Sequence, residues 1–170
     1  MRQLAICDRI LSIAQSHQIT CSYTKLKRAA LLESTKNSQK QLQLSVTPRL
    51  PTDMSPINDD LQRLEMWRCL CALIGPDILR IVEFAKRIPD FTKVPQQEQI
   101  VLLKAHFFAV WLLRIACMID PHALTFDSGY CITRAQLDLV YGANSVTKLI
   151  DFARQITALK LNDIEVGLIA

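Results

Sequence analysis

The chain has 170 residues, of which 50% are hydrophobic and 21% charged, with only 4 Gly. This length suits one domain, and the apolar fraction excludes disorder for most of the chain. Aromatic residues make up 6%, and Leu, Ile and Ala alternate with Lys, Arg, Gln and Glu, a balance that favours helix over strand. The net charge of +4 is too small to indicate a nucleic-acid-binding face.

The cysteines do not follow a metal-binding or disulfide pattern. Six are present, but no Cys-x-x-Cys pair occurs and Cys69 and Cys71 stand alone as Cys-x-Cys. Most are flanked by apolar residues, as Cys117 is. The sequence therefore predicts free thiols, mostly buried, in a reducing compartment and no bound metal.

Neither a secretory signal nor a membrane span is predicted. The first ten residues contain Arg2, Asp8 and Arg9, which interrupt any apolar signal core. The longest uninterrupted apolar stretch, 107–113, has seven residues, far fewer than the roughly 20 that cross a bilayer. We expect a soluble intracellular protein with no membrane partner.

Apolar residues at helical spacing predict one helix over 1–32, bent near 19–22. Polar residues and then prolines dominate 33–59, which predicts a flexible Pro-rich loop; the prolines are Pro48, Pro51 and Pro56.

A long helix is predicted to follow the loop and to end at Pro89. Gly75 and Pro76 interrupt its apolar face, so we expect a kink or a break there. Pro95 opens the next helix, whose apolar residues run around the whole wheel as far as Ile115. Such a helix is typical of the middle of a domain.

Near the C-terminus the pattern predicts a small hairpin from 123–126 and 130–132. Thr133 is expected to cap the next helix, and residues 142–145 to separate it from a helix over 146–159. Asn162 and Asp163 are a good helix start, yet the sequence stops soon after, at Ala170. A helix so short and apolar leads us to expect a sequence cut off inside a domain.

No enzyme is predicted. His17, His106 and His122 lie on different segments without an acidic or nucleophilic partner at a motif spacing, and no Gly-rich phosphate loop occurs. His106, on an apolar helix, is better interpreted as a core or pocket histidine than as a metal ligand.

Residues 81–91 and 95–105 resemble the signature of nuclear receptor ligand-binding domains. The matching elements are Phe-Ala-Lys at 84–86, Phe91, the acidic Glu98 with Gln99, and the Leu pair at 102–103. Three later stretches, 124–129, 133–137 and 161–168, look most like the retinoic acid and thyroid hormone receptor group; 8–30 is weakly similar to that group's first helix.

The resemblance implies an all-α fold, an incomplete three-layer antiparallel helical sandwich with one short β-hairpin. The domain would occupy 60–170 and stop after the start of its eighth helix. It would bind a small lipophilic hormone-like ligand, with no other cofactor, and regulate transcription in the nucleus.

Implied partners are the Leu-rich helical motifs of coactivators and corepressors and, in the full-length protein, a retinoid X receptor-type partner. DNA would bind only through a zinc domain absent from this chain. The alternative is a ligand-independent truncated isoform that competes for coregulators.

The resemblance also implies a coregulator groove at the end of the family's third helix and on its fourth. Carried over position by position, the groove comprises Val82, Lys86, Ile100, Leu103 and Lys104. A lysine at its rim would meet the negative C-terminal end of a Leu-x-x-Leu-Leu peptide helix, and Lys86 suits that role. The alternative is that both lysines are solubilising charges at helix ends.

For the ligand pocket, helical position suggests Phe84, Leu113, Arg114, Cys117, Met118 and Phe126. Met118 stands where acid-binding members of the group have an arginine, which puts a carboxylate ligand in doubt. Arg114, one turn earlier, either anchors an acid or a carbonyl group or forms a structural ion pair.

Overall fold

The structure is a computed structural model that describes residues 2–39 and 56–170. Seven helices and one two-stranded sheet lie within these ranges. The helices are α1 (Arg2–Thr20), α2 (Lys25–Gln39), α3 (Pro56–Arg87), α4 (Gln96–Ile115), α5 (Arg134–Tyr141), α6 (Ala143–Ala158) and α7 (Asp163–Ile169); short 3-10 turns cover Phe91–Lys93 and Ala116–Met118, and the strands are β1 (Ala123–Thr125) and β2 (Cys131–Thr133).

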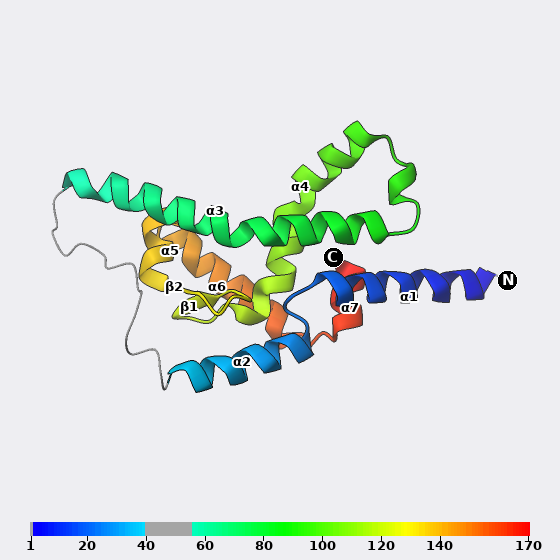
Figure 1. Cartoon of the computed structure of the whole chain (residues 1–170), viewed down its shortest axis with the longest axis horizontal. Helices are drawn as coiled ribbons and strands as arrows, with labels where there is room; N and C mark the ends of the chain where they lie inside the picture. Colours follow the sequence, from blue (N-terminus) through cyan, green and yellow to red (C-terminus); the bar gives the residue numbers. More distant parts are fainter. Residues whose placement is uncertain (1, 40–55) are drawn as a thin grey trace.

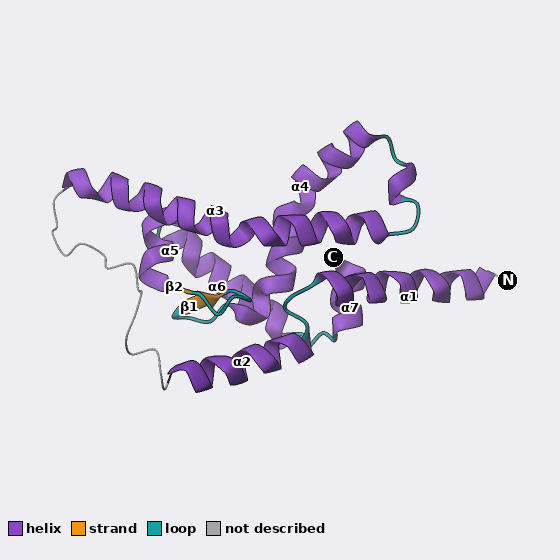
Figure 2. Cartoon of the chain, in the orientation of Figure 1, coloured by secondary structure: helices purple, strands orange, loops and turns teal. Residues whose placement is uncertain are grey.

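The helices pack around α3 and the C-terminal half of α4. In Figure 1, α4 crosses α3 and descends toward α6, and α7 lies across α1 near the end of that helix. Contacts of α1 with both α7 and α3 agree with this arrangement. The core is built where α3, α4, α6 and the hairpin meet, and its most buried members include Leu70, Ile115, Leu124, Phe126 and Ile132. The fold is the predicted helical assembly with one small hairpin (Figure 2).

The N-terminal segment differs from the single helix predicted over 1–32. Residues 21–24 form a turn between α1 and α2, because Cys21 and Tyr23 point inward and are buried. The second helix continues to Gln39, so the predicted loop over 33–59 begins too early. Pro56 is the first residue of α3, while Pro48 and Pro51 lie outside the described residues.

The long third helix does not break at Gly75 and Pro76. It runs continuously from Pro56 to Arg87 with Pro76 inside it, so the predicted break is wrong, and in Figure 1 the helix bends only gently. Proline removes one backbone donor, but buried residues on both sides, Leu70 and Ile81, hold the helix against the same core.

The hairpin and its flanking caps match the sequence prediction. The strands pair antiparallel with Leu124 opposite Ile132, and Gly129 in the turn has a φ of 80°, which glycine adopts without steric cost. Thr133 accepts a hydrogen bond from the backbone of Gln136, whose side chain reciprocates, so α5 begins with a capping box. Gly142, with a φ of 79°, alone separates α5 from α6, which begins at Ala143 rather than at the predicted residue 146.

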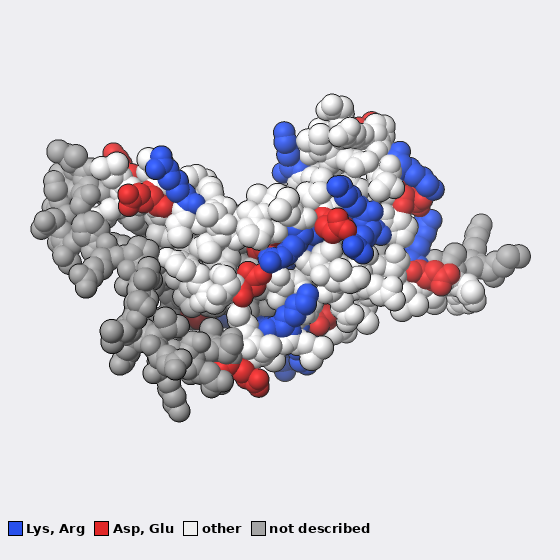
Figure 3. All heavy atoms as spheres, viewed as in Figure 1, with Lys and Arg blue, Asp and Glu red and all other residues white. Residues whose placement is uncertain are grey.

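The fourth helix, α4, is buried only in its C-terminal half. Trp111, Arg114 and Ile115 in its C-terminal half are buried, whereas Val101 is 65% and Phe108 56% exposed. The segment Gln96–Met118 is long and apolar enough to cross a membrane by length and composition; its C-terminal half nevertheless packs in the core formed with α3 and the hairpin. Figure 3 shows acidic and basic side chains interspersed over one face, without a field of one sign.

Candidate functional site

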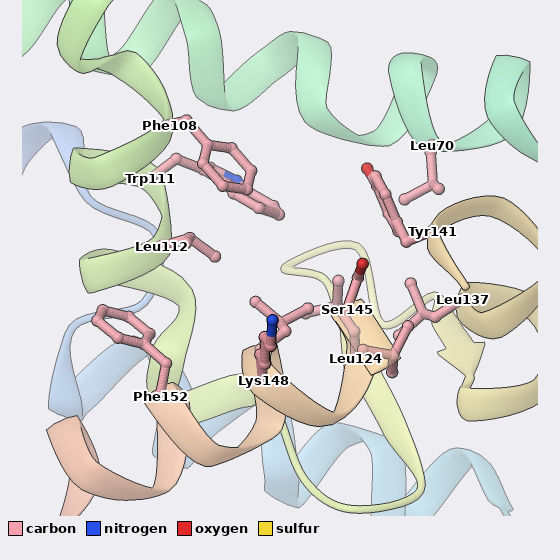
Figure 4. A pocket seen from close by; sticks show the side chains of 12 residues that line it. Leu70, Phe108, Trp111, Leu112, Leu124, Leu137, Tyr141, Ser145, Lys148 and Phe152 are labelled. Carbon is pink, nitrogen blue, oxygen red and sulfur yellow. The ribbon is translucent and has the colours of Figure 1, made fainter. Parts of the chain in front are cut away.

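An apolar cavity of about 300 Å³ lies between α3, α4, α5, α6 and β1. In Figure 4, Phe108 and Trp111 of α4 face Leu137 and Tyr141 of α5 across the space, and Ser145 of α6 lies between them. The complete lining is Leu70, Phe108, Trp111, Leu112, Leu124, Leu137, Tyr141, Ser145, Val146, Lys148, Leu149 and Phe152. Almost all of this surface is carbon, so the cavity suits a small apolar molecule rather than bound water.

A second cavity of about 520 Å³, here called the basic cavity, lies between α1, the start of α2, the end of α4, α6 and α7. Four of its described lining residues carry a positive charge and one a negative charge; they are Lys25, Arg28, Arg114, Lys160 and Asp163. The rest of the lining is His17, Cys21, Tyr23, Leu113, Ala116, Cys117, Ile156, Thr157, Leu161, Asn162 and Val166.

Arg114 is the most unusual group in this lining. Its side chain is buried, with the residue only 5% exposed, and the guanidinium lies 4.3 Å from the centre of the Phe84 ring. Neither Nε nor Nη2 has a hydrogen-bond partner, and no ion pair to Arg114 is found among the described residues. Burial lowers the pKa of this guanidinium. The structure thus gives no support to the structural ion-pair alternative.

A buried hydrogen-bond network separates the two cavities. The Asp77 carboxylate of α3 accepts bonds from the Tyr23 hydroxyl at 2.8 Å and from the Trp111 indole N–H at 3.0 Å. Arg80 bonds to Asp77 at 2.8 Å and to Asp127 in the hairpin turn at 2.7 Å. Burial and the neighbouring Asp77 carboxylate raise the pKa of Tyr23, so its hydroxyl stays protonated as a donor. The network fixes the α1–α2 turn, α3, α4 and the hairpin in one arrangement.

The structure does not bring the six predicted pocket residues together. Leu113, Arg114 and Cys117 line the basic cavity. Phe84, Met118 and Phe126 are buried in the core and line none of the cavities described here.

Sequence reasoning missed the α5 and α6 part of the apolar cavity. Leu137 and Tyr141 are one helical turn apart, as are Ser145 and Leu149, and Phe152 follows three residues later. This spacing places each set on one helix face, so the amphipathic pattern of these two short helices could have identified them.

The five predicted groove residues lie at the end of the molecule where α3 and α4 are joined by a short turn (Figure 1). Val82 and Leu103 are half-buried, Ile100 is 37% exposed, and Lys86 and Lys104 are exposed. None of them lines either cavity. The groove therefore stays a prediction, with its apolar members partly covered and both lysines in solvent.

Comparison with known proteins assigns the family. Residues 61–170 match the ligand-binding domain of nuclear hormone receptors. The chain belongs to this family. All of the apolar cavity's lining, from Leu70 to Phe152, falls within the matched residues, whereas the basic cavity also uses α1 and α2, which precede them.

Three relatives extend the match. The chain is 35% identical over 167 residues to ecdysone-induced protein 78C of Drosophila melanogaster, covering 98% of this chain and 18% of that protein. It is 32% identical over 160 residues to nuclear hormone receptor E75 of Metapenaeus ensis, covering 92% and 26%. It is 36% identical over 110 residues to retinoic acid receptor gamma of Xenopus laevis, covering 63% and 23%. The chain thus spans about a quarter or less of each relative.

The predicted placement in the retinoic acid and thyroid hormone receptor group is not confirmed. The retinoic acid receptor match is confined to part of the chain, while the ecdysone-induced and E75 matches include α1 and α2 as well. The match to ecdysone-induced protein 78C covers 98% of the chain and therefore reaches the residues at 8–30.

Proposed function

We propose that this ligand-binding domain binds a small lipophilic molecule in the apolar cavity and passes that event to coregulators that control transcription in the nucleus. The observation that carries the proposal is the apolar cavity itself, which is formed by elements of the matched domain and lined by carbon. Removing an apolar ligand's surface from water there would stabilise the complex by about 25 cal/mol for each Å² buried. Tyr141, Ser145 and Lys148 supply the few polar groups that would orient it.

The coregulator site proposed for the same domain is the groove at Val82, Lys86, Ile100, Leu103 and Lys104. The half-buried Val82 and Leu103 and the partly exposed Ile100 offer apolar contacts for the leucines of a Leu-x-x-Leu-Leu helix. Lys86, in the last turn of α3, is exposed and can meet the carbonyl groups at the peptide helix C-terminus. In the whole receptor we further propose a retinoid X receptor-type partner, and DNA contact through a zinc domain outside this chain.

Fluorescence polarisation with a labelled Leu-x-x-Leu-Leu peptide tests the groove. We expect Lys86→Ala to weaken peptide binding at least tenfold, because the charge at the peptide's C-terminal end is lost. Arg154→Ala is the matched control, since Arg154 is an exposed cation on α6, away from the groove. Equal affinity of both variants for the peptide would contradict the proposed site.

Native mass spectrometry of the chain tests the apolar cavity. We expect a lipophilic molecule to be retained by the wild-type chain and to be lost from a Leu137→Trp variant, because the indole would occupy the cavity. Retention by the variant would place the ligand elsewhere.

A further inference from the structure

We propose that the ligand of the apolar cavity is a flat aromatic molecule of about two fused rings, which stacks on Phe108. This inference rests on the proposed function, because it names the class of ligand for the same cavity. The volume of about 300 Å³ limits the size of that ligand. Since a cavity of about 150 Å³ holds benzene, twice that volume takes roughly 12 carbon atoms, which corresponds to two rings.

The inner end of the apolar cavity is closed. Leu70, Leu124, Leu137 and Val146 line it, and each of them is at most 2% exposed. Little of their surface is therefore available to a ligand. The accessible apolar wall comes from side chains that remain partly exposed; they are Phe108, Leu112, Tyr141, Leu149 and Phe152. Most of these residues are aromatic, so a ligand in the cavity lies mainly against rings.

The Phe108 ring is held as a stacking surface by the residues behind it. Its centre lies 5.8 Å from the centre of the Trp111 ring, with 29° between the ring planes, which is a stacked arrangement. Trp111 is buried and is fixed by the hydrogen bond from its indole N–H to Asp77 at 3.0 Å. Phe108 itself is 56% exposed, so much of its ring surface is open to a further ring. A flat aromatic ligand would extend this stack.

Tyr141 supplies a second ring, on the other side of the space from Phe108 (Figure 4). It packs edge-on against Trp67, with the ring centres 5.9 Å apart, and this contact restricts its orientation. Both rings are thus held before a ligand enters, which lowers the entropic cost of binding. Ser145 and Lys148 line the same cavity and are exposed, so a hydroxyl group of the ligand can bond to them while remaining partly in water.

Isothermal titration of the 170-residue chain with three alcohols tests the proposal. 2-Naphthol, decahydro-2-naphthol and 1-decanol have the same number of non-hydrogen atoms and one hydroxyl group each, but only the first is flat and aromatic. We expect 2-naphthol to bind about threefold to tenfold tighter than decahydro-2-naphthol, which is the size of effect that one aromatic pair supplies. It should also bind tighter than 1-decanol, whose flexible chain loses more conformational entropy. Equal or tighter binding of either saturated alcohol would overturn the proposal.

Substitution of Phe108 tests the stacking surface. In Phe108→Leu the affinities for 2-naphthol and decahydro-2-naphthol should agree within about twofold, whereas Phe108→Trp should keep the preference for 2-naphthol. Val101→Ala is the matched control, since Val101 is an exposed apolar residue of the same helix and is not among the described lining residues. A preference for 2-naphthol that survives in Phe108→Leu would contradict the assigned stack.

Methyl NMR locates the bound 2-naphthol independently. Its ring currents should shift the methyl resonances of Leu112 and Leu149, which line the apolar cavity, and leave those of Leu113 and Leu161 in the basic cavity unchanged; the reverse pattern would overturn the proposal. Native mass spectrometry of Leu137→Trp reports separately on the proposed function. Loss of a lipophilic molecule from that variant, without any preference for 2-naphthol in the wild type, would keep the cavity as the ligand site and overturn only the aromatic class of ligand.

Discussion

Gly167 of α7 lies directly against His17 of α1. A Cβ atom at position 167 would stand 2.7 Å from the His17 Cβ and 3.0 Å from its Cγ, closer than side-chain atoms can approach. The two helices are in contact with each other in the fold. The absent side chain at 167 therefore sets how closely the N-terminal helix approaches the C-terminal one.

Gly167→Ala is expected to destabilise the fold by about 1–3 kcal/mol, because the two helices must move apart to accept a methyl group. Gly75→Ala is the control, since nothing lies within 4 Å of the added Cβ there. Its helix-propensity gain is opposed by crowding against Pro76, so a change below about 1 kcal/mol is expected. Urea unfolding followed by tryptophan fluorescence measures both, and equal stabilities would contradict the close contact.

Stability should fall in acid through His17. Burial, followed by the nearby Arg114 charge, lowers the pKa of His17 from 6.5 to about 4. In the unfolded chain His17 is protonated below pH 6.5, whereas in the folded chain it stays neutral until the pH falls to about 4. Stability is therefore complete above pH 6.5 and declines as the pH falls through this window, by roughly 3 kcal/mol at about 1.4 kcal/mol per pKa unit.

The measurement is the urea midpoint of the wild type and of His17→Gln at pH 7.5 and pH 5. Between pH 7.5 and pH 5 the wild type should lose more stability than His17→Gln, since the glutamine does not titrate. A parallel loss in both proteins would assign the acid sensitivity to other groups.

Asp77→Ala should destabilise the fold by about 2–4 kcal/mol, because the Tyr23 hydroxyl and the Trp111 indole N–H would be left buried without an acceptor. Tyr23→Phe, which removes one donor only, should cost about 1–1.5 kcal/mol. Asp151→Ala serves as the control because its pair with Arg154 is exposed, and a change within about 0.5 kcal/mol is expected. Thermal and urea unfolding rank the three, and a harmless Asp77→Ala would refute the network's structural role.

Asn162→Ala should weaken the start of α7 by about 1 kcal/mol. The Asn162 side chain accepts the backbone N–H groups of Ile164 at 2.9 Å and Glu165 at 3.0 Å, and the Glu165 carboxylate accepts the N–H of Asn162 at 2.8 Å. Asn162→Ser keeps a capping oxygen and should stay within a few tenths of a kcal/mol of the wild type. Hydrogen exchange of α7 amides reports the difference directly, and indistinguishable protection in the two variants would argue against the cap.

Features fixed by short-range interactions were predictable from the sequence. Thr133 bonds to Gln136 only three residues away, and Asn162 bonds to its immediate neighbours. The hairpin register likewise follows from a turn of a few residues around Gly129. In each case the residue type alone specifies the geometry that it adopts.

Features that depend on distant partners were not predictable. The turn at 21–24 exists because Tyr23 reaches Asp77, 54 residues along the chain. Helical position placed Arg114 in a common pocket with Phe126, but Arg114 lines the basic cavity whereas Phe126 is fully buried in the core. Phe84 was expected to line the pocket and instead packs edge-on against His17, with its ring face under Arg114.

The C-terminal half of α4 lines both the apolar cavity and the basic cavity. Leu112 faces the apolar cavity, and its neighbour Leu113 faces the basic one, so a rotation of α4 that widens one space narrows the other. Because α4 lines both cavities, a shift of this helix alters the shape of both. Trp111, whose indole N–H is bonded to Asp77 and whose ring lines the apolar cavity, is the side chain whose fluorescence would register such a shift.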